Sequence, residues 1–143
     1  MHLRSFLLVI GQFGSIAILL FGGDWQLPWW AWGLFALGLL VFTWAVTSLG
    51  TNNFTILPDP RNGNTLSHRG VYRYLRHPMY TAVLLCGGAV AFGAPSIPRW
   101  IALCACLVVL VLKVGHEERL LTQKHPSYPE QMAGVARLFP RIW

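Results

Sequence analysis

The chain has 143 residues, of which 55% are hydrophobic and 11% are charged, and its formal net charge is +6. Soluble domains carry about 25% charged residues, so this composition excludes an ordinary water-soluble fold and indicates a single membrane-embedded domain spanning the chain. The positive charge would suit nucleic acid only as a solvated basic surface. No segment outside the apolar runs offers such a surface, so we predict no nucleic-acid partner.

Four apolar segments follow one another along the chain, and each is a candidate membrane-spanning helix. They cover about residues 5–22, 28–49, 79–94 and 98–115. We therefore expect an all-α integral membrane protein with four transmembrane helices. A loop over residues 50–78 joins the second and third, and a helical or extended tail covers residues 116–143.

The distribution of basic residues predicts the orientation. Ten of the eleven Lys and Arg residues precede the first segment, lie in the 50–78 loop, or follow from Lys113 onward. The opposite ends of the segments carry only Asp24 and Arg99. Because four spans place those three basic regions on one side, the positive-inside rule predicts that both termini, the loop and the tail are cytoplasmic.

The tail begins as a polar extension of the fourth segment, which Pro126 and Pro129 are expected to break. Residues 135–143 mix basic and apolar side chains, as a segment lying on the membrane surface does. The sequence identifies no partner for His116 or His125.

The interior of the predicted spans holds few polar or ionisable side chains. No Asp, Glu or His lies at mid-depth, which argues against a pump or ion transporter. The three cysteines lie within apolar runs and predict neither a disulfide nor a metal site.

Polar residues gather instead where the third segment begins. Pro78 suits the first position of a helix, which puts His77 beside free backbone N–H groups and the positive end of the helix dipole. Such a helix start attracts anions, and Arg73, Arg76 and His77 add donors for a carboxylate or phosphate.

A second polar group, Glu117 and Glu118, lies where the fourth segment ends. The third and fourth segments form an antiparallel hairpin, so we expect His77 and Glu117 to be neighbours. An anion-binding side facing an acidic side matches the carboxylate, ammonium, ribose diol and sulfonium of S-adenosylmethionine. Taken singly, these residues are more simply topology signals, solvated helix ends or interfacial aromatics, so the prediction depends on their combination.

Together the residues resemble the isoprenylcysteine carboxyl methyltransferase and phospholipid methyltransferase group of membrane enzymes. That group carries a Gly-x-Tyr-x-x-x-Arg-His-Pro-x-Tyr stretch before a helical hairpin and a Glu-Glu pair after it. The stretch and the pair are formed here by Gly70, Tyr72, Arg76, His77, Pro78, Tyr80, Glu117 and Glu118. A terminal pattern is matched by Tyr128, Val135, Arg137 and Pro140, so the resemblance covers about residues 50–143.

The resemblance implies an S-adenosylmethionine-dependent methyltransferase that releases S-adenosylhomocysteine and acts on a lipophilic acceptor within the bilayer. The residues that it implies for cofactor binding are Tyr72, His77, Tyr80, Glu117 and Glu118. It implies catalytic roles for Arg76 and His77, with Arg76 holding the cofactor carboxylate or the acceptor, and acceptor binding by Arg73 and Arg137. No metal is implied.

Several alternatives stay open at this point. The acceptor can be an isoprenylated cysteine, an ethanolamine lipid, a small thiol or a quinone-like compound, and the oligomeric state is undetermined. A non-catalytic membrane scaffold would use the same charges for topology or for a partner. A membrane reductase has similar hydropathy, although the chain carries no glycine-rich dinucleotide fingerprint.

Overall fold

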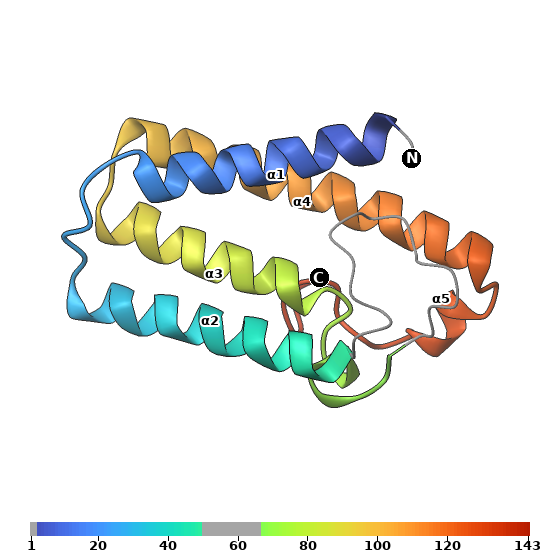
Figure 1. Cartoon of the computed structure of the whole chain (residues 1–143). Helices are drawn as coiled ribbons and strands as arrows, with labels where there is room; N and C mark the ends of the chain where they lie inside the picture. Colours follow the sequence, from blue (N-terminus) through green and yellow to red (C-terminus); the bar gives the residue numbers. More distant parts are fainter. Residues whose placement is uncertain (1–2, 50–66) are drawn as a thin grey trace.

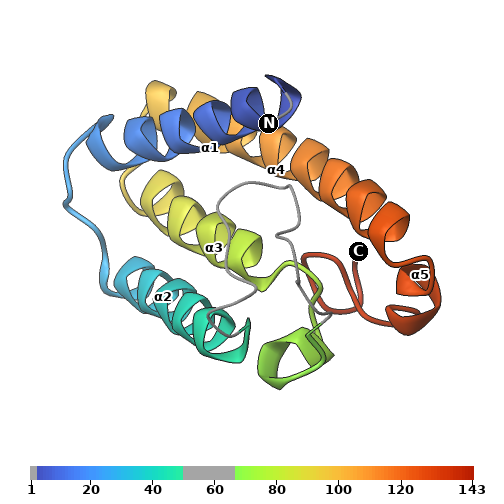
Figure 2. The ribbon, with the colours of Figure 1, turned by 45° about the vertical axis from the view of Figure 1, so that its right-hand side comes forward.

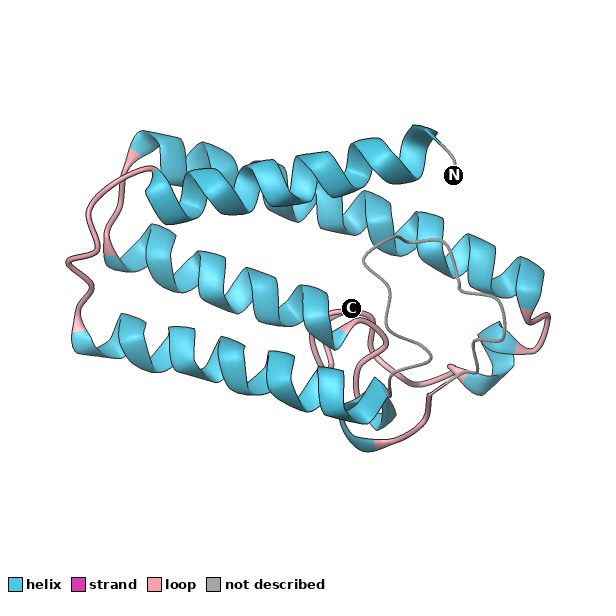
Figure 3. Cartoon of the chain, in the orientation of Figure 1, coloured by secondary structure: helices cyan, strands magenta, loops and turns pink. Residues whose placement is uncertain are grey.

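The computed structural model describes residues 3–49 and 67–143, so most of the predicted 50–78 loop lies outside the described residues. The helices are α1 (Leu3–Phe21), α2 (Trp29–Leu49), the short 3-10 helix η1 (Gly70–Arg73), α3 (Pro78–Gly93), α4 (Ile97–Lys124) and α5 (Tyr128–Gln131). Figure 3 shows that helices and loops make up the described part of the chain, with no strand drawn in it. The prediction of an all-α fold is confirmed.

The helices begin where the sequence places start signals. Pro78 is at the first turn of α3, as predicted. At the start of α4, the Ser96 side chain accepts a hydrogen bond from the Arg99 N–H, and a proline again lies in the first turn. These signals explain why the four helices begin within about two residues of the predicted segments, whereas α4 extends beyond residue 115 to Lys124.

Three helices, α1, α2 and α4, are long and apolar enough to cross a membrane. The sixteen residues of α3 rise about 24 Å, less than the roughly 30 Å of hydrocarbon in a bilayer. The chain is thus an all-α integral membrane protein, and the number of complete spans stays a prediction.

The four long helices pack as two pairs, α2 along α3 and α1 along α4, and the pairs meet where α3 contacts α4 and α1 (Figures 1 and 2). More than half of α3 is buried, mostly through alanine and glycine. Gly38 of α2 approaches α3 so closely that a Cβ there would lie 2.5 Å from the Cys86 sulfur. Small side chains therefore let the other helices enclose α3.

The two ends of the bundle differ. One end holds the starts of α1 and α3, the ends of α2 and α4, and the tail, hereafter the residues that follow α4, 125–143 (Figure 1). The opposite end holds the loops 22–28 and 94–96. The basic regions that the structure describes thus lie at one end of the bundle, as predicted, and this end is hereafter called the basic end.

Arg99 organises the opposite end and is fully buried. Its guanidinium donates to the backbone carbonyls of Leu19, Gly23, Asp24 and Ala94, at 2.8 to 3.1 Å. These carbonyls belong to the end of α1, the following loop and the end of α3. One side chain thus satisfies acceptors that helix ends leave unpaired.

The tail departs from its predicted position. As expected, α4 continues as a polar helix to Lys124, but Pro129 lies in the first turn of α5 and does not break a helix there. Leu138 is 1% exposed and packs with a core cluster that includes Leu84 and Leu110, so the prediction of a surface-lying segment is wrong for this residue. Burial of a large apolar side chain in a protein core is favourable, and the composition of the tail alone does not reveal that such a core position exists.

Candidate active site

The stretch before α3 is fastened to the end of α2. Gly70 has a positive φ of 54°, and a Cβ there would overlap the Ser48 hydroxyl, so both conformation and space require glycine. Val71 and Leu75 are buried against Ala45 of α2. This anchoring fixes the backbone that carries Arg76 and His77.

The tail pairs with the same stretch. Leu75 and Ala136 form an isolated parallel bridge. The Arg76 N–H donates to the Ala136 carbonyl at 2.7 Å, and the His77 N–H donates to the Arg137 carbonyl at 3.0 Å. The backbone N–H of His77, directly before α3, is therefore not free for an anion, because the tail supplies its acceptor.

Arg76 joins the tail to α4. Its Nε donates to the Val135 carbonyl and its Nη2 to the Met132 carbonyl, both at 2.8 Å. Its Nη1 lies 3.3 Å from Glu118 Oε1. The guanidinium thus directs all three nitrogens at acceptors within the protein.

Glu118 is the centre of this network, and its side chain is 12% exposed. Its Oε1 lies 3.3 Å from both Arg76 Nη1 and His77 Nε2, and its Oε2 accepts from Arg137 Nε at 3.0 Å. The Arg137 guanidinium also lies over the Trp143 ring, 5.2 Å from its centroid. A carboxylate with three such donors holds the start of α3, the end of α4 and the tail together.

Glu117 faces the other side of His77. Its Oε2 accepts a 2.8 Å hydrogen bond from the Tyr80 hydroxyl and lies 3.6 Å from His77 Nδ1. The His77 and Tyr80 rings are stacked, with centroids 5.5 Å apart and planes 2° from parallel. The expected proximity of His77 and Glu117 is confirmed, and His77 lies between the two carboxylates.

Two further tyrosines line this region. Burial raises the pKa of the Tyr72 phenol well above its ordinary value, and the charge of Glu117 raises it further. Burial and then Glu118 likewise raise the pKa of Tyr128, while Arg76 acts in the opposite direction. Both phenols therefore stay protonated at neutral pH.

The remaining predicted site residue, Arg73, is exposed at the end of η1. The side chains that contact Glu118 in the described part of the chain are those of Arg76, His77 and Arg137. The structure thus brings five predicted residues to the two glutamates, namely Tyr72, Arg76, His77, Tyr80 and Arg137, and leaves Arg73 outside.

The sequence did not identify two polar contacts with α1. Lys113 is 2% exposed, and its ammonium donates to Gln12 Oε1 at 2.6 Å. His116 Nε2 lies 3.1 Å from the Ser5 hydroxyl, a partner that the sequence did not identify. The sequence feature that could have indicated the Lys113 contact is a lysine within an apolar run, one helical turn before Glu117.

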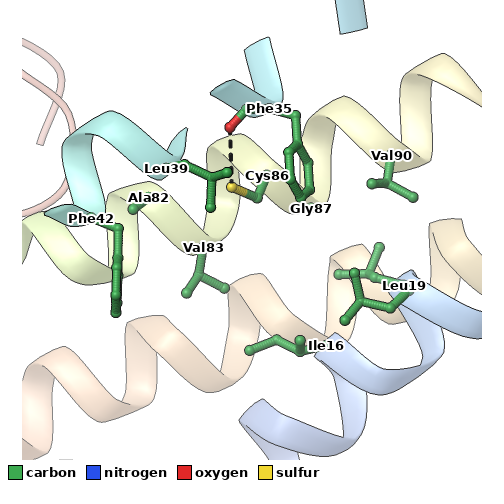
Figure 4. A pocket seen from close by; sticks show the side chains of 11 residues that line it. Ile16, Leu19, Phe35, Leu39, Phe42, Ala82, Val83, Cys86, Gly87 and Val90 are labelled. Carbon is green, nitrogen blue, oxygen red and sulfur yellow. Dashed lines mark hydrogen bonds between the residues drawn. The ribbon is translucent and has the colours of Figure 1, made fainter. Parts of the chain in front are cut away.

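An apolar cavity of about 230 Å³ lies between α1, α2 and α3 (Figure 4). Phe35, Leu39 and Phe42 line it from α2, and Val83 is among its lining residues on α3. Val83 also packs, with Tyr80, against the core cluster beneath the polar site. The lining residues on α3 thus extend from Ala82, two residues after Tyr80, to Val90.

These features define an all-helical membrane protein with a compact polar site at one end of its bundle and an apolar cavity beside it. The family model for phospholipid methyltransferases matches residues 27–127, well over half of the chain, and the chain belongs to that family. No curated protein matched the chain in a separate comparison.

The family assignment confirms the resemblance drawn from the motifs and implies methyl transfer to a lipid-like substrate. The matched residues include the stretch from Gly70 to Tyr80 and both glutamates. They end at residue 127, so the tail from Tyr128 onward, with Arg137, lies outside the matched region.

Proposed function

We propose that this protein transfers a methyl group from S-adenosylmethionine to a lipophilic acceptor at the cytoplasmic face of a membrane, releasing S-adenosylhomocysteine. The observation that carries the proposal is the position of His77. It contacts both glutamates and stacks on Tyr80 where α3 begins and α4 ends. Membership of the phospholipid methyltransferase family supports a role of this cluster in methyl transfer.

We assign different roles to the two glutamates. Both oxygens of Glu118 accept from Arg76, His77 or Arg137, so Glu118 is proposed as a positioning residue. Glu117 is twice as exposed, at 24%, and has Tyr80 as its closest donor. A carboxylate accepts about four hydrogen bonds, so Glu117 retains capacity for the ammonium or ribose hydroxyls of the cofactor.

The other side chains follow from this division. His77 and Tyr80 form a stacked surface suited to contact the cofactor, and Tyr72 adds a protonated phenol beside Glu117. We propose that Arg76 positions the tail, because its donors point at Met132, Val135 and Glu118. Arg73 and Arg137 remain the proposed contacts for the acceptor headgroup.

Bound S-adenosylmethionine would supply an electrophilic methyl group on its sulfonium. The protein must then align the acceptor with that methyl and exclude water, and no reactive side chain is required for a carboxylate acceptor. For an amine or thiol acceptor, His77 is the proposed proton acceptor through Nδ1, because Nε2 donates to Glu118.

The hydrocarbon part of the acceptor is proposed to occupy the cavity between α1, α2 and α3. Its lining is apolar, and on α3 it begins at Ala82, two residues after Tyr80. A lipid would thus reach the site laterally from the bilayer, while the cofactor enters from water. Both then meet at the start of α3.

The cytoplasmic assignment rests on charge. The basic end carries Arg4, Arg69, Arg73, Arg119, Lys124 and Arg141 among the described residues. The opposite end has one arginine, Arg99, which is buried and bonded to backbone carbonyls. Because Arg99 is engaged within the protein, it does not count against the orientation that the positive-inside rule favours, with the basic end in the cytoplasm.

Calorimetric titration of S-adenosylmethionine and S-adenosylhomocysteine into detergent-purified protein tests the proposal. Micromolar binding is expected for the parent protein and loss of binding for His77→Ala and Glu117→Gln. Glu130→Gln, an exposed change of the same type on α5, is the matched control and should bind normally. Absence of binding by the parent protein in every lipid and detergent tested would favour the non-catalytic scaffold.

The acceptor class is tested separately with S-adenosylmethionine labelled on its methyl group. The protein is incubated with an S-prenylated cysteine bearing a free carboxylate, with vesicles containing an ethanolamine lipid, or with a small thiol. Label that partitions into lipid only with one of these identifies the acceptor. Label transferred to none of them, with cofactor binding intact, would leave the acceptor proposal without support.

A further inference from the structure

A polar contact lies between α1 and α4, below the active site. Lys113 belongs to α4 and lies four residues, or about one turn, before Glu117. Its ammonium donates to Gln12 Oε1 at 2.6 Å, and both side chains are buried, at 2% and 7% exposure. Ionisable residues are unfavourable within membrane helices and mark functional positions by default.

The same ammonium contacts the active site through an aromatic ring. Lys113 Nζ lies 5.1 Å from the centroid of the Tyr80 ring, within the range of a cation–π interaction. His77 stacks on that ring as well. The Tyr80 hydroxyl donates to Glu117. Gln12, Lys113, Tyr80 and Glu117 therefore form one continuous series of contacts from α1 to the proposed cofactor carboxylate.

Stability alone does not account for this series. Replacing buried polar pairs by well-packed apolar residues is often neutral or stabilising, so two leucine-sized side chains would join α1 to α4 at least as well. A buried ammonium at this position attracts the Tyr80 ring and so holds the ring in one orientation. The ring in turn sets where the hydroxyl meets Glu117.

We propose that Lys113, held by Gln12, is a positioning residue that fixes the Tyr80 ring so that its hydroxyl stays on Glu117. This inference rests on the proposed function, because it takes Glu117 to bind the cofactor. It extends the site to α1, since Gln12 lies outside the residues matched by the family model. The first helix thereby contributes to cofactor affinity as well as to membrane insertion.

The test is a comparison of S-adenosylhomocysteine affinity in two backgrounds. The double change Gln12→Leu/Lys113→Met removes both partners of the hydrogen bond between α1 and α4 together. In the parent protein it should weaken S-adenosylhomocysteine binding about five- to tenfold, within the range between exposed and desolvated cation–π contacts. In a Tyr80→Phe background, where the hydroxyl is absent, the same double change should alter affinity less than about twofold.

Two further variants separate positioning from folding. Lys113→Arg keeps a cation near the ring and should retain most of the affinity. Gln12→Asn keeps the amide but shortens its reach, so it should give an intermediate loss even if the double variant does not fold. Ser15→Ala is the matched control, because Ser15 shares the buried face of α1 but bonds to the Gly11 carbonyl of its own helix.

Each outcome decides one proposal. If the parent protein binds S-adenosylhomocysteine and the double change weakens binding equally in both backgrounds, the positioning role is wrong. Unchanged affinity for every Gln12 and Lys113 variant overturns it as well. If the parent protein does not bind the ligand at all, the proposed function fails first and this inference falls with it.

Discussion

At the scale of single residues, two adjacent glutamates differ in what surrounds them. Glu118 receives donors from Arg76, His77 and Arg137, whereas Glu117 faces Tyr80 and is the more exposed. Burial with several internal donors is typical of a structural carboxylate, and spare acceptor capacity is typical of a binding one. The sequence motif Glu-Glu does not separate these roles, because it carries no information on which oxygen meets which donor.

The two glutamates are therefore expected to respond differently to the same substitution. Glu118→Gln should lower the free energy of unfolding by about 2 kcal/mol, since it weakens contacts to two arginines, one of which is 40% exposed. Glu117→Gln should change stability little and abolish binding of S-adenosylhomocysteine. Thermal unfolding in detergent beside calorimetry measures both quantities. Equal effects of the two substitutions on both readouts would contradict the division of roles.

Arg99 provides a second prediction at this scale, far from the active site. Arg99→Met removes the donor for four backbone carbonyls in a buried setting, so it should lower the free energy of unfolding by about 3 kcal/mol. Cofactor affinity of the protein that remains folded should be unchanged. The check is a thermal unfolding curve followed by titration of the folded fraction. A stable variant with weakened binding would point to a role that the contacts of Arg99 do not explain.

At the scale of elements, the sequence predicts the long helices well and the tail poorly. Helices α2, α3 and α4 follow from local signals, an apolar run bounded by Pro28, Pro78 or Pro98. The fold of the tail depends on contacts with residues about sixty positions away, such as the bridge between Leu75 and Ala136. Pairing of that kind has no local signature, so composition alone indicated a membrane-surface segment.

The same reasoning separates the predictable from the unpredictable part of the site. His77 and Glu117 could be brought together from the hairpin, because an antiparallel pair of helices puts its start and its end on one face. The contact of Lys113 with Tyr80 depends on how α3 packs against α4, and its hydrogen bond with Gln12 depends on how α1 packs against α4. The sequence around Gln12 shows no pattern that predicts a partner. Helix packing in three dimensions, not sequence periodicity, determines such pairs.

The tail yields a prediction of its own. Leu138 is 1% exposed and packs with Leu84, Leu110 and Val114. Leu138→Ala should cost about 2–4 kcal/mol and loosen the tail from α3, which also removes Arg137 from Glu118. Limited proteolysis should then cleave the tail earlier than in the parent protein, with weaker S-adenosylhomocysteine binding. Ile142→Ala, an 82% exposed position in the same tail, is the control and should change neither readout. A tail that stays resistant would contradict this docking.

At the scale of the whole molecule, the two helix pairs create the space that an acceptor needs. α1 packs along α4 and α2 along α3, so the cavity forms where α1 and α2 are separated across α3. In the proposed function, hydrocarbon from the bilayer and a cofactor from water approach one site from different media.

The cavity permits a test that leaves the cofactor site intact. Leu39 lines it from α2 and is 51% exposed, so Leu39→Trp can fill the space without overpacking the core. It should raise KM for a long-chain acceptor about fivefold or more while leaving S-adenosylhomocysteine affinity and a short-chain acceptor unaffected. Leu40→Trp, at a neighbouring, 67% exposed position outside the cavity lining, is the matched control. Methyl transfer kinetics with acceptors of two chain lengths distinguish the variants. Equal behaviour of Leu39→Trp and Leu40→Trp would mean that the hydrocarbon chain binds elsewhere, because only the first substitution narrows this cavity.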